Sequence, residues 1–407
     1  MNITVTVAPG STNHGQEGLL CVPPVWHDYI VFYFANYFAH AMTVVTHPGQ
    51  SPWEIAILVI SALLFPASGA SRAIDAILRH AAFKRNVLQR AADAGALCMV
   101  AHKHSESRPT ESKLPWWKPY NPMEVPPGTA VHGKYPKGCT LVYVPMGAPI
   151  HFRESDDTSV DTKQAISCSY NIPKLVFSLL QAIWAIVTLY RAHGDQVEQY
   201  GYAAFGLTVV PYAFMSVLNT IANILNPDYP AVYMVRTPQM ELREARGGVF
   251  AGEISVQLSD EAVEGRYFRD TSSWLPLGFW ASLVQIGIVG GLSRFRPQRS
   301  TSMQRGFTMS WLVLGIFFAF SADSPMILRA EYWRERTFCL SLYNVALLSV
   351  QLCIPGIAAL GGFVVVGMMI RDYGHRQETL DVSGIRSEEQ QPCIARAEPG
   401  PWVDMHA

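Results

Sequence analysis

Residues 25–40, VWHDYIVFYFANYFAH, combine an apolar character with acid, imidazole, amide and phenol groups that could do chemistry. On a helix that turns 100° per residue, six of the side chains share one face. These six, which we call the aromatic stripe, are Trp26, Tyr29, Tyr33, Asn36, Tyr37 and His40. Phe32, Phe34 and Phe38 are expected to face lipid. Aromatic ring faces stabilise positive charge without supplying a nucleophile, so the stripe suits a transient carbocation.

Carbocation chemistry also needs an acid, and two of the carboxylates near the apolar segments are the preferred candidates. Asp28 lies near the start of the stripe, and Glu54 opens the next apolar segment. In an apolar pocket a carboxylic acid has a raised pKa and can protonate an olefin or an epoxide. Asn36 or His40 could then take up the final proton. The alternatives are interfacial solvation of Asp28, a favourable helix-dipole position for Glu54, and hydrogen bonding between helices for Asn36 and His40.

A second unusual segment, residues 200–224, carries Pro211 together with Asn219 and Asn223. The two asparagines are spaced i and i+4, so they share one helix face. Broken helices that carry amides coordinate ions and polar substrates in transporters. This segment is therefore the main support in the sequence for transport rather than catalysis.

Other site types are not indicated. The sequence contains no phosphate-binding glycine loop, no dinucleotide fingerprint and no zinc-protease motif, so we expect no cofactor and no metal. His102 and His104 are expected to be a solvated pair, and the acidic run DDTSVD at 156–161 a polar loop. A net charge of −1 and the absence of a basic domain argue against a nucleic-acid partner.

The composition indicates that a membrane positions these residues. Charged residues make up 15% of the chain, whereas soluble domains have about 25%. Apolar runs of roughly 20 residues can cross a bilayer. We expect spans at 25–46, 53–70, 172–190, 200–224, 274–292, 308–322 and 338–370. The predicted fold is an all-α polytopic transmembrane bundle of about seven spans, with six to eight as the range.

Two of these segments are irregular. Pro66 and Gly69 lie near the end of segment 53–70, which makes it the span least expected to cross fully. Segment 338–370 is too long for one untilted span, and Pro355 with Gly356 could kink it or divide it into a hairpin.

The chain divides into four parts by polarity. Residues 1–70 hold the N-terminal tail and two membrane segments, and 71–171 form a polar insert that begins as an amphipathic helix and becomes proline-rich. Residues 172–370 form the main bundle, which includes a polar loop at 225–273, and 371–407 are expected to be a disordered tail. We expect a multi-pass protein of the endoplasmic reticulum or plasma membrane, with its oligomeric state left open.

The segment from Leu189 to Thr237, centred on YGYAAFGLTVVPY, resembles a signature of fungal multi-pass membrane proteins. ELREARGGVFAGEISV extends the resemblance, and VVTHPGQSPWEIAILVISALLFPASGAS adds to it more weakly. Pro66-Ala67-Ser68 stands where that group tends to show Ala-Pro-Glu. The resemblance implies architecture more than chemistry. In size and layout the chain is also loosely similar to membrane-bound terpene cyclases of fungal meroterpenoid pathways.

Together these observations favour an intramembrane enzyme of fungal secondary metabolism. The expected reaction is acid-initiated cyclisation of a lipophilic, prenylated substrate by a terpene cyclase. The alternative is a non-catalytic membrane protein, either a transporter or a scaffold.

Overall fold

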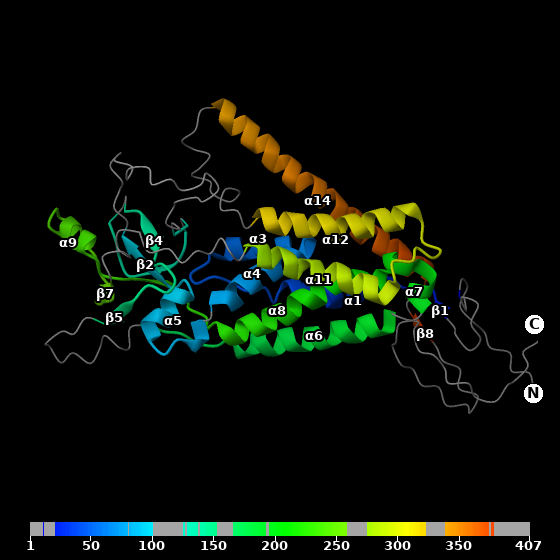
Figure 1. Cartoon of the computed structure of the whole chain (residues 1–407), viewed down its shortest axis with the longest axis horizontal. Coiled ribbons are helices and arrows are strands. Elements are labelled where there is room, and N and C mark those ends of the chain that lie inside the picture. The colour runs from blue at the N-terminus through cyan, green and yellow to red at the C-terminus, as the bar shows by residue number, and fades with distance from the viewer. Residues whose placement is uncertain are drawn as a thin grey trace, which may run out of the picture.

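The computed structural model describes residues 11, 21–79, 81–100, 125–126, 128–136, 139–152, 166–192, 195–258, 275–322, 338–373 and 376–377. Its long helices lie side by side in an elongated bundle, and a small β-sheet unit occupies one end (Figure 1). His102, His104, the acidic run 156–161 and the tail beyond residue 377 lie outside the described residues.

Most of the described chain is helical. The N-terminal segment forms α1, the π-helical turn η1 and α2, and a loop then leads into α3 and α4. The main helical elements of the bundle are α1 (Trp26–Tyr33), η1 (Phe34–Phe38), α2 (Ala39–Ala41), α3 (Pro52–Leu64), α4 (Pro66–Arg79), α6 (Ile172–Ala192), α8 (Val210–Leu225), α11 (Leu275–Ser293), α12 (Ser302–Ala322) and α14 (Phe338–Tyr373). The other helical elements are η2 (Ala81–Phe83), α5 (Val87–Asp93), α7 (Asp195–Tyr200), η4 (Gly201–Ala203), η5 (Phe205–Val209) and α9 (Pro238–Glu244).

Three of the described helical stretches are long and apolar enough to cross a membrane: Ile172–Tyr190, Phe205–Leu225 and Cys353–Tyr373. The bent pair α3–α4 would make a fourth if it counts as one span. A total of about seven spans stays a prediction. The hairpin suggested for 338–370 is wrong, because α14 continues as one helix through Pro355.

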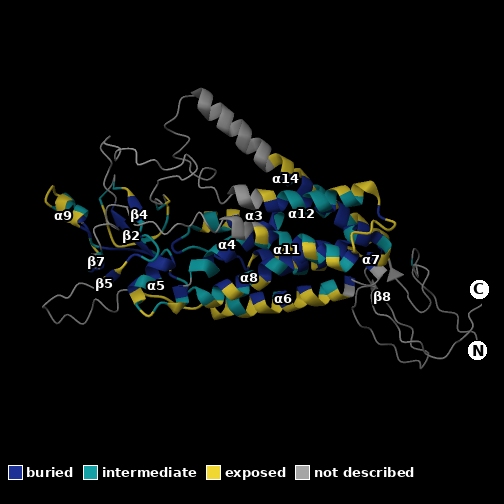
Figure 2. Ribbon diagram, viewed as in Figure 1, coloured by how far each residue is buried: buried dark blue, intermediate teal, exposed yellow. Residues whose placement is uncertain are grey.

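Helix α6 shows how the bundle divides its surfaces. Its inner face consists of small residues, including Ser178, Ala182 and Ala185, which are buried. Its outer face exposes large apolar side chains such as Phe177, Leu180 and Trp184 along its length (Figure 2). Small residues let helix backbones approach closely, and an exposed apolar face of this kind suits lipid.

The two polar regions of the sequence meet in one sheet. The insert supplies β2 (Leu97–Val100), β3 (Val131–His132) and β4 (Leu141–Tyr143), and the later loop supplies β6 (Val232–Met234). The strand order is β3-β6-β2-β4, with β6 parallel to β2 and β3 and with β4 antiparallel to β2. In addition, β5 (Ile150–Phe152) pairs with β7 (Val256–Leu258), and β1 (Cys21–Val22) pairs with β8 (Arg376–Gln377).

A sharp elbow separates α3 from α4. The two helices are bent by 117° at Phe65, which has φ −133° and ψ 77° and precedes Pro66. Proline disfavours the helical conformation in the residue before it, so α3 ends here. The bend agrees with the irregularity expected near Pro66 and Gly69, and incomplete crossing by segment 53–70 stays a prediction.

The elbow leaves the last carbonyls of α3 without hydrogen-bond donors from their own helix. Side chains from other helices donate to these carbonyls instead. The Tyr212 hydroxyl of α8 donates to the Leu63 carbonyl, and Trp311 Nε1 of α12 donates to the Leu64 carbonyl at 2.7 Å. Ser68 Oγ donates to the Phe65 carbonyl at 2.8 Å. Backbone groups in an apolar interior need such partners. Each buried group without a hydrogen bond costs about 1–3 kcal/mol of stability in mutational data.

We therefore expect Tyr212→Phe to destabilise the protein, because it removes the donor to Leu63 while keeping the ring. The expected loss is about 1–2 kcal/mol of unfolding free energy, measured as a lower melting temperature of the detergent-solubilised protein. Tyr190→Phe is the matched control, since Tyr190 is 84% exposed. Equal melting temperatures for the two variants would contradict a stabilising role of this bond.

Candidate functional site

The aromatic stripe contains a π-helical turn. In η1 the amide of Ala39 donates to the carbonyl of Phe34, five residues earlier. A π turn inserts one residue into the helical repeat and re-aims the side chains around it, and such turns are frequent at functional sites. Here the turn brings both Asn36 and Tyr37 into the buried interior, although neighbouring residues on an α-helix diverge by 100°.

Asn36 and His40 are buried and bond to neighbouring helices. Asn36 Nδ2 donates to the Phe32 carbonyl at 2.9 Å, and Asn36 Oδ1 accepts from Thr188 Oγ1 of α6 at 3.1 Å. His40 Nδ1 lies 2.5 Å from Ser216 Oγ of α8. These contacts join α1, η1 and α2 to α6 and α8. The amide of Asn36 has a partner at both ends, whereas His40 Nε2 has none among the described residues.

Tyr33 and Tyr37 also bond across the bundle. The Tyr33 hydroxyl donates to the Phe363 carbonyl of α14 at 2.5 Å. The Tyr37 hydroxyl lies 2.7 Å from Thr208 Oγ1, which itself lies 2.5 Å from the Phe205 carbonyl and donates to it. Because the single Thr208 proton is directed to Phe205, Tyr37 is the donor to Thr208.

Tyr37 lies at the centre of an aromatic cluster. Its ring centroid is 4.7 Å from Tyr212, 5.3 Å from Phe363, 5.7 Å from Phe32 and 5.9 Å from Trp311. Trp311 and Phe363 are themselves 4.7 Å apart. Phe32, which the helical projection directs to lipid, is 6% exposed and packs into this cluster. The prediction that Phe32 faces lipid is therefore wrong, whereas Phe34 and Phe38 are exposed as predicted.

The remaining residues of the stripe and the two acids lie elsewhere. Trp26 is 75% exposed, and Tyr29 is half-buried beside the C-terminal end of α14. Asp28 Oδ2 accepts from the Val25 amide at 2.8 Å, and Glu54 Oε2 accepts from the Ser51 amide at 2.9 Å. Each carboxylate therefore holds a helix N-terminus, where the dipole favours negative charge.

Asn219 and Asn223 lie on α8, the helix that also carries Ser216, the partner of His40. Asn219 is fully buried, and its Nδ2 donates to Thr43 Oγ1 at 3.2 Å. Asn219 Oδ1 and Asn223 Nδ2 are buried atoms with no partner among the described residues. Both asparagines thus keep unused hydrogen-bonding capacity inside the protein.

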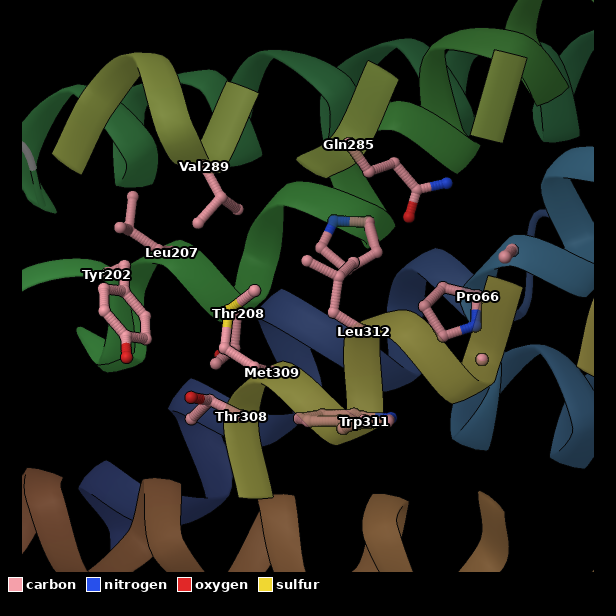
Figure 3. Close-up of a pocket in the computed structure, with 13 residues that line it drawn as sticks. Pro66, Tyr202, Leu207, Thr208, Gln285, Val289, Thr308, Met309, Trp311 and Leu312 are labelled. Atoms are coloured by element: carbon pink, nitrogen blue, oxygen red, sulfur yellow. The ribbon is translucent and has the colours of Figure 1, made fainter. Parts of the chain in front are cut away.

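A narrow cleft opens beside the aromatic cluster, between α4, the η4–α8 segment, α11 and α12 (Figure 3). We call it the bundle cleft. Its walls are mostly apolar, and its volume of about 20 Å³ has room for one water molecule. Its lining residues are Pro66, Ala67, Tyr202, Leu207, Thr208, Pro211, Gln285, Val289, Thr308, Met309, Trp311, Leu312 and Gly315.

Gln285 is the unexplained polar group of the bundle cleft. It is fully buried, and neither its Oε1 nor its Nε2 has a hydrogen-bond partner among the described residues. Figure 3 shows it projecting from α11 toward the other lining side chains. The hydroxyls of Thr208 and Thr308 do not donate to Gln285 Oε1, because each donates to a backbone carbonyl. Nearly all buried amides in proteins are paired, and the cleft beside this one has room for a water molecule or a ligand atom that would pair with it.

Sequence reasoning from residues 25–40 leads to the cluster but misses much of the cleft. Tyr212, Trp311 and Gln285 come from distant segments, and only the fold brings them to Tyr37 and Thr208. A signal was present for Gln285, because it interrupts the apolar run SLVQIGIVGG. Polar residues within apolar spans usually have a function or a specific partner.

Comparisons with protein-family models, curated proteins and solved structures gave no match for this chain. Within the described residues, no three His, Cys, Asp or Glu side chains gather as metal ligands would. The candidate site therefore consists of the aromatic cluster and the bundle cleft, argued from geometry alone.

Because the buried amide of Gln285 is unpaired, we expect Gln285→Leu to raise the melting temperature. Replacing an unpaired polar group by an apolar one of similar size removes a desolvation cost of about 1–3 kcal/mol. Gln304→Leu is the control, because Gln304 Oε1 accepts from the Thr301 amide at 2.8 Å and that bond would be lost. A lower melting temperature for Gln285→Leu would show that its amide is already satisfied.

Proposed function

We propose that the protein is a multi-pass membrane enzyme that binds a lipophilic small molecule in the bundle cleft, and more specifically a terpene cyclase acting on a prenylated substrate. The observation that carries this proposal is the unpaired amide of Gln285 in a cleft that Trp311 also lines, with the ring of Tyr37 packed against Trp311. An amide can orient a carbonyl, hydroxyl or epoxide oxygen, and the rings can stabilise a cation formed nearby.

Substrate entry in this proposal requires a movement of α11. The cleft has a volume of about 20 Å³, which is too small for a prenyl chain. Gly287 and Gly291 of α11 are exposed and have no heavy atom within 4 Å of an added Cβ, so this outer face of the helix leaves room for outward movement. A shift of α11 away from α4 and α12 would widen the cleft on the side where Gln285 lies.

The initiating acid is the part of the proposal with the least support from geometry. Asp28 and Glu54 remain the proposed acids, yet both cap helix N-termini, and no carboxylate lines the cleft among the described residues. Either carboxylate would have to leave its cap to protonate a substrate. The geometry therefore supports binding of a lipophilic oxygen compound more directly than it supports protonation.

Transport is the second candidate function, and one observation favours it. Asn219 Oδ1 and Asn223 Nδ2 are buried, unpaired and on the same helix, as polar groups along a substrate path would be. In that case Asn219→Leu should disable efflux in whole cells, while membranes containing the protein form no new product.

The test is expression of the full chain in a host that lacks it, followed by incubation of its membranes with a prenylated aromatic precursor and with the epoxide of that precursor. We expect a cyclised product from the wild type. Gln285→Leu and Trp311→Ala should reduce product formation at least tenfold, because they remove the orienting amide and one cation-stabilising ring.

Trp280→Ala is the matched control, since Trp280 is 65% exposed on the same helix as Gln285. Asp28→Asn and Glu54→Gln test the acid separately, and full activity in both would remove the acid assignment. No product from either precursor, with transport abolished by Asn219→Leu, would replace the cyclase by the transporter.

A further inference from the structure

A second, larger cavity lies where the bundle meets the sheet unit. It has a volume of about 360 Å³, which falls within the range of roughly 300–1,000 Å³ found for small-molecule sites. Its walls come from the loop between α2 and α3, from α4, from the turn after α8 and from residues 167–169. We call it the junction cavity, and it shares no lining residue with the bundle cleft.

Arg79 and His47 line the junction cavity, and Arg72 lies close enough to act electrostatically on His47. Arg79 lines the wall, and Asp75 Oδ2 accepts from its Nε at 2.9 Å and from its Nη2 at 2.6 Å, which leaves Nη1 outside that pair. His47 also lines the wall. Burial lowers the pKa of His47 well below its ordinary value of 6.5, and the positive charges of Arg72 and Arg79 lower it further. The imidazole is therefore neutral at physiological pH and lies close to both guanidinium groups.

The cavity wall also carries a carboxylate with a cation nearby. Asp228 lines the cavity, and the Lys174 ammonium at the start of α6 is close enough to attract it. Arg72, Arg79 and Lys174 thus oppose Asp75 and Asp228, an excess of one positive charge among these five groups while His47 is neutral. A low-dielectric wall strengthens such an excess for any anion inside.

Two buried polar groups on the wall have no hydrogen-bond partner among the described residues, the Asn223 Nδ2 donor and the Tyr229 hydroxyl. Asn223 Nδ2 is buried and has no partner among the described residues, whereas the neighbouring Asn226 Nδ2 donates to the Ala76 carbonyl at 2.8 Å. An amide nitrogen can only donate, so Asn223 selects a ligand that carries an acceptor. Excess positive charge and a free donor in the same cavity both point to an oxyanion.

We propose that the junction cavity binds an oxyanionic group, a phosphate ester or a carboxylate, through Asn223 and Arg79, with His47 beside it. The cavity lies where α8 ends and α6 begins, at the boundary between apolar helices and the polar sheet unit. A lipid headgroup can reach such a depth from the membrane, and a water-soluble phosphate ester can reach it from the aqueous side.

The test measures binding to the full-length protein in neutral detergent and phosphate-free buffer by isothermal titration calorimetry. The probes are inorganic phosphate, short-chain dihexanoyl phosphatidic acid, and uncharged dihexanoylglycerol. We expect saturable binding of phosphatidic acid and none of dihexanoylglycerol. Binding of inorganic phosphate as well would assign the site to free oxyanions, and its absence would assign it to lipid headgroups.

Variants locate the site. Asn223→Leu and Arg79→Gln should each weaken binding about tenfold or more, because each removes a donor to a charged acceptor. Arg299→Gln is the control, since this exposed arginine lies in the α11–α12 loop, whose backbone bonds to η4 and α7. Asn223→Leu keeps the test decisive if Arg79→Gln fails to fold.

Three outcomes would overturn the proposal. The first is that neither inorganic phosphate nor phosphatidic acid binds saturably. The second is that dihexanoylglycerol binds as tightly as phosphatidic acid. The third is that Arg299→Gln loses as much affinity as Asn223→Leu and Arg79→Gln. In each case the cavity would be a solvated gap between the sheet unit and the bundle.

Discussion

The bundle depends on the hydrogen bonds that close the backbone at the elbow between α3 and α4. An apolar interior offers no water to unpaired carbonyls, so a 117° bend is stable only where side chains supply donors. Tyr212 and Trp311 are those donors, and they come from α8 and α12. Each donor ring also packs in the aromatic cluster around Tyr37. The same two side chains therefore close the elbow and build the aromatic cluster, and Trp311 also lines the bundle cleft.

Close helix packing supports this arrangement. Gly362 of α14 lies against Trp311, and a Cβ at that position would be 2.5 Å from the indole ring. Because Gly362 has no side chain, the indole can contact Phe363 while its Nε1 reaches the Leu64 carbonyl. A larger residue at position 362 would displace the indole from the elbow, and the cleft beside it would change shape as well.

Local periodicity predicts the long helices and much of the stripe, because burial along a helix follows the positions of its own side chains. It correctly directs Tyr37 and His40 inward and Phe34 outward. It fails at Phe32, which is buried against Phe205 of η5, because no local pattern announces a contact with so distant a segment. It also treats 71–171 and 225–273 as separate loops, although β2 and β6 pair in one sheet. Strand pairing over that separation is a property of the whole chain.

Some buried amides of the interior have hydrogen-bond partners, and others have none among the described residues. Asn36 has a partner for both its nitrogen and its oxygen, so its polarity is explained by the joining of helices. Gln285 and Asn223 each keep a buried group without a partner, and each lines a cavity. Unpaired polar atoms destabilise a fold, which means that packing alone gives no physical reason for placing an amide in either cavity. A ligand that completes the hydrogen bonds gives one. The separation of the two cavities places an apolar site with one amide inside the bundle and a cationic site at its edge.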